Sequence, residues 1–185
     1  AFVGFFVDNY DIFLPVIALA PAMIYFIPPG ELSPTMAAVV SAMIFATTLI
    51  GRPLGAIIFG HYADTIGRKR VTVLCVLGFG IVTLMIAALP GYQHWGEGVL
   101  WVFIALRLID GIFLGGEYTS ANPLAMEYSP KAKRGFYGAI IQSAASLGTA
   151  FISLVTLAVL YFVPGGSLES PYVQWGWRIP FILGA

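Results

Sequence analysis

The sequence is poor in charged residues, in cysteine and in histidine. Charged side chains make up 10% of the 185 residues, and nine basic and nine acidic residues leave no net charge. A chain without excess positive charge offers no basic face for nucleic acid. The single cysteine, Cys75, has no partner for an intrachain disulfide and lies in an apolar run, so a packing role is expected. His61 and His94 lie at opposite ends of predicted membrane spans, so we expect no metal site, no cofactor and no enzymatic activity.

Long apolar runs dominate instead. Hydrophobic residues make up 59% of the chain and the mean hydropathy is +0.89, which is typical of a protein that resides in a lipid bilayer. A bilayer core about 30 Å thick requires roughly 20 helical residues. The sequence therefore predicts an all-α polytopic membrane protein with five spans and part of a sixth, at about 1–27, 36–63, 71–90, 99–128, 135–163 and 176–185.

The distribution of charge over the polar breaks predicts the orientation of these spans. The second and fourth breaks, 64–70 and 129–134, contain the clustered lysines and arginines, whereas the first, third and fifth contain Glu31, Glu97 and Glu169. By the positive-inside rule, the second and fourth breaks are cytoplasmic in a protein of the cell inner (plasma) membrane. Ser33-Pro34 is a start signal for the second helix.

Several ionisable residues lie inside the predicted spans, where each costs on the order of 3 kcal/mol near a helix centre and is a functional candidate by default. Asp8 and Asp11 are three residues apart and share one face of the first helix. Arg107, Asp110 and Glu117 fall in one stripe of the fourth helix.

Two interpretations of these charges remain open. Arg52 or Arg107 could pair with Asp110 as buried ionic glue without further function. Alternatively, Glu117, which has no basic residue within one turn, or Asp8 could load and unload a proton, as coupling to a proton gradient requires.

Small and polar residues mark further helix surfaces. Gly51 and Gly55 in the second helix, and Gly111 and Gly115 in the fourth, allow close approach of neighbouring backbones in a static or a moving interface. Gln142, Ser146, Thr149 and Ser153 form a polar stripe in the fifth helix, which could line a solute path or make interhelical hydrogen bonds. Pro15 and Pro21 are expected to kink the first helix near Tyr10, a candidate solute contact.

The break between the second and third spans has the most specific pattern. It reads Gly60-His61-Tyr62-Ala63-Asp64-Thr65-Ile66-Gly67-Arg68-Lys69-Arg70. This matches the Gly-x-x-x-Asp-x-x-Gly-Arg-basic-basic signature that joins the second and third helices of the major facilitator superfamily. The chain thus resembles the N-terminal six-helix bundle of that fold, truncated in its sixth helix and without the C-terminal half.

Other segments resemble the metabolite:proton symporter branch of this superfamily. They include Arg52-Pro53-Leu54-Gly55-Ala56, Gly115-Gly116-Glu117-Tyr118 and Trp175-Gly176-Trp177-Arg178. The first helix, with Asp8 and Asp11, is also similar to phosphate:proton symporters, whereas Asn122-Pro123 departs from the metabolite branch.

The residue patterns and the resemblance together assign expected roles to three groups of residues. Those expected in proton coupling are Asp8, Asp11 and Glu117, and those expected to contact substrate are Tyr10, Arg52, Arg107, Tyr118, Asn122, Gln142 and Ser146. Those expected in a cytoplasmic gate between the two halves are Gly60, Asp64, Gly67, Arg68, Lys69, Arg70 and Arg134.

The expected function is proton-coupled symport of a small polar metabolite, an organic acid or zwitterion, by alternating access. The partners are the solute, protons and the lipid bilayer, and the full-length protein is expected to be monomeric. The alternatives are a uniporter or antiporter on the same fold, or a membrane sensor that does not transport.

Overall fold

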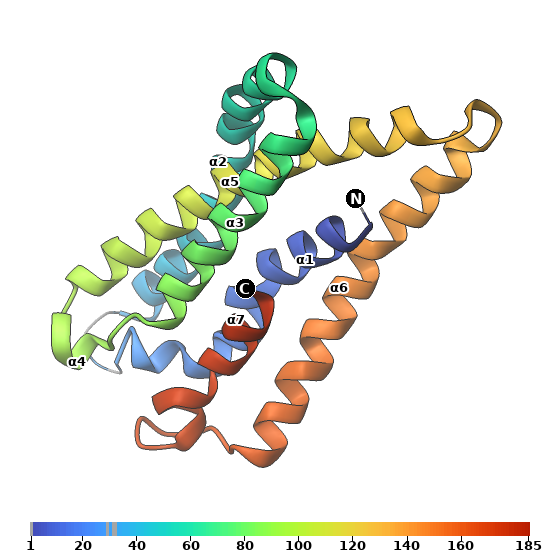
Figure 1. The fold of residues 1–185 in the computed structure, drawn as a ribbon. Coiled ribbons are helices and arrows are strands. Elements are labelled where there is room, and N and C mark those ends of the chain that lie inside the picture. The colour runs from blue at the N-terminus through green and yellow to red at the C-terminus, as the bar shows by residue number, and fades with distance from the viewer. Residues whose placement is uncertain (1, 29, 31–32) are drawn as a thin grey trace.

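The computed structural model describes residues 2–28, 30 and 33–185, and within these ranges the chain is helical and contains no strand. This confirms the predicted all-α fold (Figure 1). Four helices are long and apolar enough to cross a membrane, the last together with the short 3-10 helix η3 (Lys131–Lys133) that precedes it. They are α2 (Pro34–Ile66), α3 (Arg68–Ala87), α5 (Gly98–Tyr128) and α6 (Arg134–Phe162).

The first apolar run is divided into three pieces. It comprises α1 (Phe2–Phe13), the π-helix η1 (Leu14–Ala18) and the 3-10 helix η2 (Ala20–Tyr25). Pro15 lies in η1 and Pro21 in η2, and each lacks the N–H group that a continuous α-helix needs. The kinks predicted at these prolines are therefore present, and α-helical geometry ends at Phe13 rather than continuing to residue 27.

Helices α2 and α5 are in close contact through glycines. A Cβ atom added to Gly51 would lie 2.5 Å from the backbone oxygen of Leu108 on α5. In the opposite direction, Gly111 and Gly115 pack against the backbones of Thr48 and Arg52 on α2, with no room for a side chain. The predicted close approach is thus observed, and it brings the charged residues of α2 and α5 near one another.

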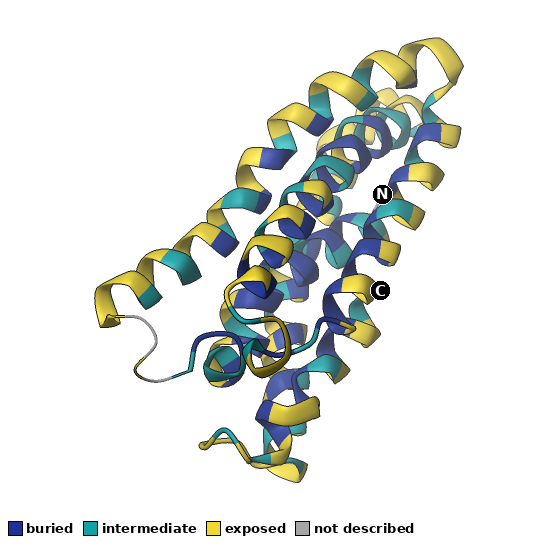
Figure 2. Cartoon of the chain, turned by 90° about the vertical axis from the view of Figure 1, so that its left-hand side faces the viewer, coloured by how far each residue is buried: buried dark blue, intermediate teal, exposed yellow. Residues whose placement is uncertain are grey.

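Helix α5 is the central element of the bundle. Half of the residues in its most apolar stretch are buried, against 22% in α2 and 17% in α6. Figure 2 shows the largely exposed outer surface of α2, which begins at the grey trace. The charged candidates on α5, Arg107, Asp110 and Glu117, therefore lie in the interior, whereas Tyr118 is exposed.

The end of the chain closes over the broken first segment. The π-helix η4 (Tyr172–Gly176) leads into α7 (Arg178–Gly184), and the buried Tyr172 hydroxyl donates a 2.6 Å hydrogen bond to the carbonyl of Ala18 in η1. The Arg178 guanidinium donates to the carbonyls of Ala87, the last residue of α3, and Leu89, just after it, at 2.8 and 3.0 Å. These contacts join the segments around α1, α3 and α7 at one end of the bundle.

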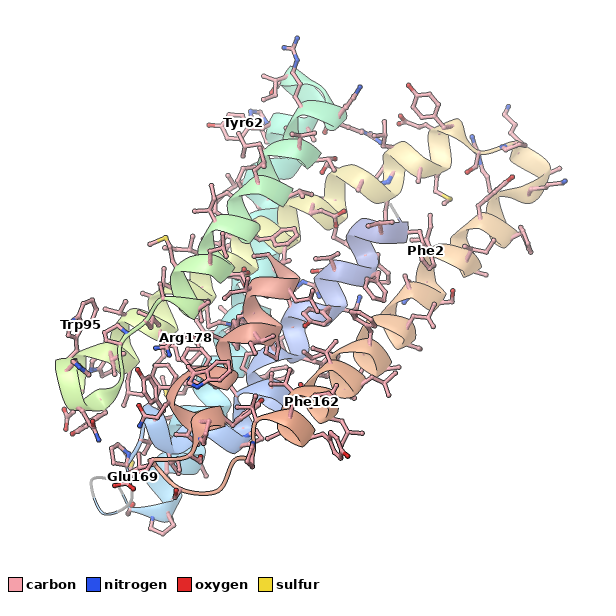
Figure 3. All side chains as sticks on the ribbon, turned by 60° about the horizontal axis from the view of Figure 1, so that its bottom comes forward. Phe2, Tyr62, Trp95, Phe162, Glu169 and Arg178 are labelled. Carbon is pink, nitrogen blue, oxygen red and sulfur yellow. The ribbon has the colours of Figure 1, made fainter. Side chains whose placement is uncertain are left out.

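The two ends of the bundle differ in their side chains. Figure 3 places Trp95, Glu169 and Arg178 toward one end and Tyr62 at the other. Trp95 belongs to the short helix α4 (Tyr92–Trp95) between α3 and α5. The basic residues of 64–70 and 129–134 flank the two connections at the Tyr62 end, from α2 to α3 and from α5 to α6 (Figure 1). The first break, with Glu31, lies partly outside the described residues.

Candidate functional site

The first ion pair of the site joins α1 to α2. Asp8 is fully buried, and one oxygen of its carboxylate accepts a short hydrogen bond from the Arg52 guanidinium, whose side chain is 25% exposed. The second Asp8 oxygen has no hydrogen-bond partner among the described residues. Arg52 therefore pairs with Asp8. The ionic-glue interpretation had offered Asp110 as its partner, and that pairing is not observed.

A second cluster, Asp11–Arg107–Asp110, lies next to the first. Nη1 of Arg107 is 3.1 Å from an oxygen of Asp11 and 3.0 Å from an oxygen of Asp110, and all three side chains are at most 1% exposed. Thr83 on α3 donates a further hydrogen bond of 3.1 Å to Asp11. The Arg107–Asp110 pairing allowed by the sequence is thus present, but Asp11 shares the same cation.

Glu117 occupies the interior between α1 and α5. It is 2% exposed, and a Cβ atom added to Gly4 would lie 3.1 Å from its carboxyl carbon. The charged side chains near enough to influence it are Asp8 and Arg52. Within the described ranges its carboxylate makes no hydrogen bond, and the nearby cation, Arg52, pairs with Asp8.

Arg52 also lines a small pocket. Its volume is about 230 Å³, and its lining residues are Arg52, Pro53, Ala56, Gly115, Tyr118 and Thr119. Two predicted substrate contacts, Arg52 and Tyr118, thus share one cavity. Its walls come from α2 and α5.

The other predicted substrate contacts are elsewhere. Arg107 is sealed inside its cluster, and the buried Tyr10 hydroxyl donates to the carbonyl of Pro180 at 2.9 Å. Asn122 is half-buried on α5, and Gln142 and Ser146 are exposed on α6. The structure does not bring these five residues into the pocket.

The polar stripe of α6 makes no interhelical hydrogen bond among the described residues. Thr149 and Ser153 donate to carbonyls of their own helix, at 3.1 and 2.9 Å. The solute-path alternative for this stripe stays a prediction.

The predicted cytoplasmic motif, residues 60–70, is almost entirely helical and does not form a loop. Asp64 lies in the last turn of α2 and Arg68 begins α3, so Gly67 alone separates the two helices, with a φ of 99°. Arg68 is 3.7 Å from Asp64 and forms a shorter ion pair of 2.7 Å with Glu127 of α5. The remaining cations of the group, Lys69, Arg70 and Arg134, are exposed, and Gly60 lies inside α2.

Three residues of the site did not emerge from the sequence as site residues. Thr83 lies in an apolar run and carries no signal of its own, whereas Gly4 shares the face of Asp8 and Asp11. Glu127 is one of few acids near a break that was predicted to be cytoplasmic. The structure identifies them by their contacts: Thr83 contacts Asp11, Gly4 contacts Glu117, and Glu127 contacts Arg68.

The site is a buried cluster of charges within a bundle of apolar helices, and comparisons with known proteins identify the family to which the chain belongs. A family model described as sugar (and other) transporter matches residues 1–185. The chain belongs to this family, within the major facilitator superfamily, as the 60–70 motif predicted. The family consists of transporters and not of enzymes.

Individual relatives give the same result. The chain is 33% identical to the shikimate transporter of Escherichia coli (strain K12) over 98% of its length, and 35% identical to the alpha-ketoglutarate permease of the same organism over 78%. The inward-open xylose transporter XylE from E. coli superposes on 98% of the chain with a TM-score of 0.78 at 22% identity. The chain spans 40%, 33% and 42% of these three proteins, respectively, and corresponds to the N-terminal half of the fold.

Proposed function

We propose that the protein is a proton-coupled symporter of a small polar metabolite, in which Glu117 carries the proton. The observation that supports this most is the burial of the Glu117 carboxyl group beside a cation that already pairs with Asp8. A carboxylate held away from water without its own counter-charge is costly, so proton binding relieves the cost. A group that exchanges a proton as helices move is what proton coupling needs.

The pocket lined by Arg52 supports an organic acid or zwitterion as the solute. A guanidinium carries five N–H donors, and Arg52 donates one hydrogen bond to Asp8. Donors that remain can meet a carboxylate in the pocket that Arg52 shares with Tyr118 and Thr119. Shikimate and alpha-ketoglutarate, after which two relatives are named, both carry a carboxylate.

We further propose that the protein acts in the cell inner (plasma) membrane by alternating access. In this orientation the 64–70 and 129–134 segments face the cytoplasm, because they hold the clustered cations at one end of the bundle. The exposed apolar surfaces of α2 and α6 are available to lipid and to a second half of the transporter. The full-length protein works as a monomer in this proposal.

The decisive experiment compares two transport modes of the full-length protein in liposomes. Uptake of radiolabelled shikimate and alpha-ketoglutarate is measured under an imposed pH gradient and as counterflow without one. We expect Glu117→Gln to abolish gradient-driven accumulation and to retain counterflow, because the amide cannot exchange a proton. Glu97→Gln, at the exposed outer end of the same helix, is the matched control and should behave as wild type. If Glu117→Gln leaves both modes unchanged, Glu117 is not the proton carrier.

The alternative functions give different results in the same assay. A uniporter transports without responding to the pH gradient even as wild type, and an antiporter requires a counter-substrate inside the vesicle. A sensor binds a solute but shows no counterflow.

A further inference from the structure

The exposed face of α3 carries a groove with a cation at one end. The volume of the groove is about 550 Å³. One lining residue, Phe113, comes from α5, and the others form a stripe along α3: Arg70, Val73, Leu74, Leu77, Gly78 and Ile81. These positions recur at intervals of three and four residues, so they share one face of the helix. Arg70 is the only charged residue in this lining.

A contact between a glycine and an aromatic ring forms the base of the groove. The Phe113 ring packs so closely on Gly78 that a Cβ atom added there would lie 2.5 Å from it. Phe59 of α2 stacks on the same ring, with the two centroids 5.6 Å apart. The aliphatic side chains of the stripe are exposed, from 50% for Leu74 to 62% for Leu77. The groove is therefore an open apolar surface on a packed base.

The length of the groove matches one leaflet of a bilayer. From Arg70 to Ile81 the helix rises about 17 Å, at 1.5 Å per residue. Half of the hydrocarbon core of a bilayer is about 15 Å thick. Arg70 lies in the first turn of α3, at the Tyr62 end of the bundle (Figure 3), so the groove extends from that end toward the middle of the helix. A cation thus lies at the level of lipid headgroups, and apolar side chains lie at the level of an acyl chain.

The charge of Arg70 is free to meet a ligand. Of the three consecutive cations that begin α3, Arg68 is paired with Asp64 and Glu127. Within the described part of the chain, neither Lys69 nor Arg70 forms an ion pair, and both are exposed. A guanidinium matches a phosphate group through two parallel N–H donors. The excess positive charge therefore favours an anionic headgroup over a zwitterionic one.

We propose that this groove is a binding site for a phospholipid with an anionic headgroup. Arg70 holds the phosphate, and the apolar stripe of α3 holds one acyl chain. Two residues of helix turn by about 200°, so Arg68 and Arg70 leave α3 on nearly opposite sides and the site is separate from the Arg68 ion pairs. The site requires only that the chain lies in a membrane, so it is independent of proton coupling and of the transported solute.

Native mass spectrometry of the full-length protein in detergent tests this site. The protein is titrated with phosphatidylglycerol and, separately, with phosphatidylcholine of the same acyl chains, and the dissociation constant of the tightest site is measured. We expect the wild type to bind phosphatidylglycerol at least about tenfold more tightly, as a charge-assisted contact provides. Arg70→Gln should remove this preference. Lys131→Gln, which removes an exposed cation at the other predicted cytoplasmic break, is the matched control and should retain it.

A second pair of variants tests the groove and not the charge. Leu77→Trp fills the groove and should weaken the binding of both lipids several-fold, because it excludes the acyl chain. Leu154→Trp, at a position of α6 that is 63% exposed, is the control and should bind both lipids as the wild type does.

Three outcomes would overturn the proposal. The first is a wild type without preference between the two lipids. The second is an equal loss of preference in Arg70→Gln and Lys131→Gln, which would mean that any surface cation attracts the lipid. The third is an unchanged affinity in Leu77→Trp, since the lipid would then be held by its headgroup alone. None of these measurements involves transport, so the proposed symport and the lipid site can fail separately.

Discussion

Arg68, the first residue of α3, forms a 2.7 Å ion pair with Glu127, near the end of α5. The same guanidinium is 3.7 Å from Asp64 in the last turn of α2. One cation thus joins three long helices at the end of the bundle that carries the 60–70 motif. The side chains are 31% exposed for Arg68 and 57% for Glu127.

This exposure limits what the pair can contribute to stability. Glu127→Gln is expected to lower the free energy of unfolding by less than about 1 kcal/mol, because exposed ion pairs are screened by water. Unfolding in detergent micelles measures the change, with Glu169→Gln in the exposed segment before η4 as control. A loss above about 2 kcal/mol would mean that Arg68 is far less solvated than its exposure indicates.

Gly67 should be sensitive to substitution because of its backbone and not because of space. Its φ of 99° is unfavourable for any residue with a Cβ, although nothing lies within 4 Å of the position a Cβ would take. Gly67→Ala is expected to destabilise the protein by about 1–3 kcal/mol. Gly60→Ala is the control, since Gly60 is inside α2 with open space and helical geometry, and it should be neutral or slightly stabilising. Equal melting temperatures for the two variants would contradict this account.

Gly115 should be sensitive to substitution because of a lack of space and not because of its backbone conformation. A Cβ atom there would lie 2.8 Å from the Cα of Arg52, so α2 and α5 would have to separate. Gly115→Ala is expected to cost about 1–3 kcal/mol in unfolding free energy. Gly98→Ala, in open space at the start of the same helix, should gain up to about 1 kcal/mol from helix propensity. Chemical unfolding of both variants measures the difference, and a stable Gly115→Ala would show that the helices can give way at this contact.

The Asp8–Arg52 pair should respond asymmetrically to the loss of each partner. Arg52→Gln leaves a fully buried carboxylate alone and is expected to cost about 3–5 kcal/mol, whereas Asp8→Asn leaves an arginine that can turn toward water and costs less. The double variant should be more stable than Arg52→Gln alone. A double-mutant cycle on thermal unfolding measures the coupling. Strictly additive losses would mean that the two side chains do not interact.

Much of the architecture follows directly from the chain. Apolar runs of about 20 residues leave few choices of structure in a bilayer, because backbone groups in lipid must be satisfied within helices. The observed helix α5, Gly98–Tyr128, accordingly lies within one residue of the predicted 99–128. Pro15 and Pro21 indicated the break in the first segment for a similarly local reason: a missing N–H.

The partners of the buried charges did not follow in the same way. Spacing along a helix establishes which residues share a face, so it placed Asp8 with Asp11 and Arg107 with Asp110. Spacing contains no information on the register between helices. The sequence therefore suggested Asp110 as a partner of Arg52, whereas the structure pairs Arg52 with Asp8. The break at 64–70 was likewise too long, because sequence composition does not show that a single glycine with positive φ can join α2 directly to α3.

The sequence by itself thus determined the membrane environment, the helices, the distribution of charge between the two ends and the family, because each depends on local composition or on a motif of fixed spacing. The tertiary structure decided which acids share which arginine and where the pocket lined by Arg52 and Tyr118 opens. Those relationships depend on how closely Gly51, Gly111 and Gly115 let α2 approach α5, and on the face that the broken first segment turns toward them.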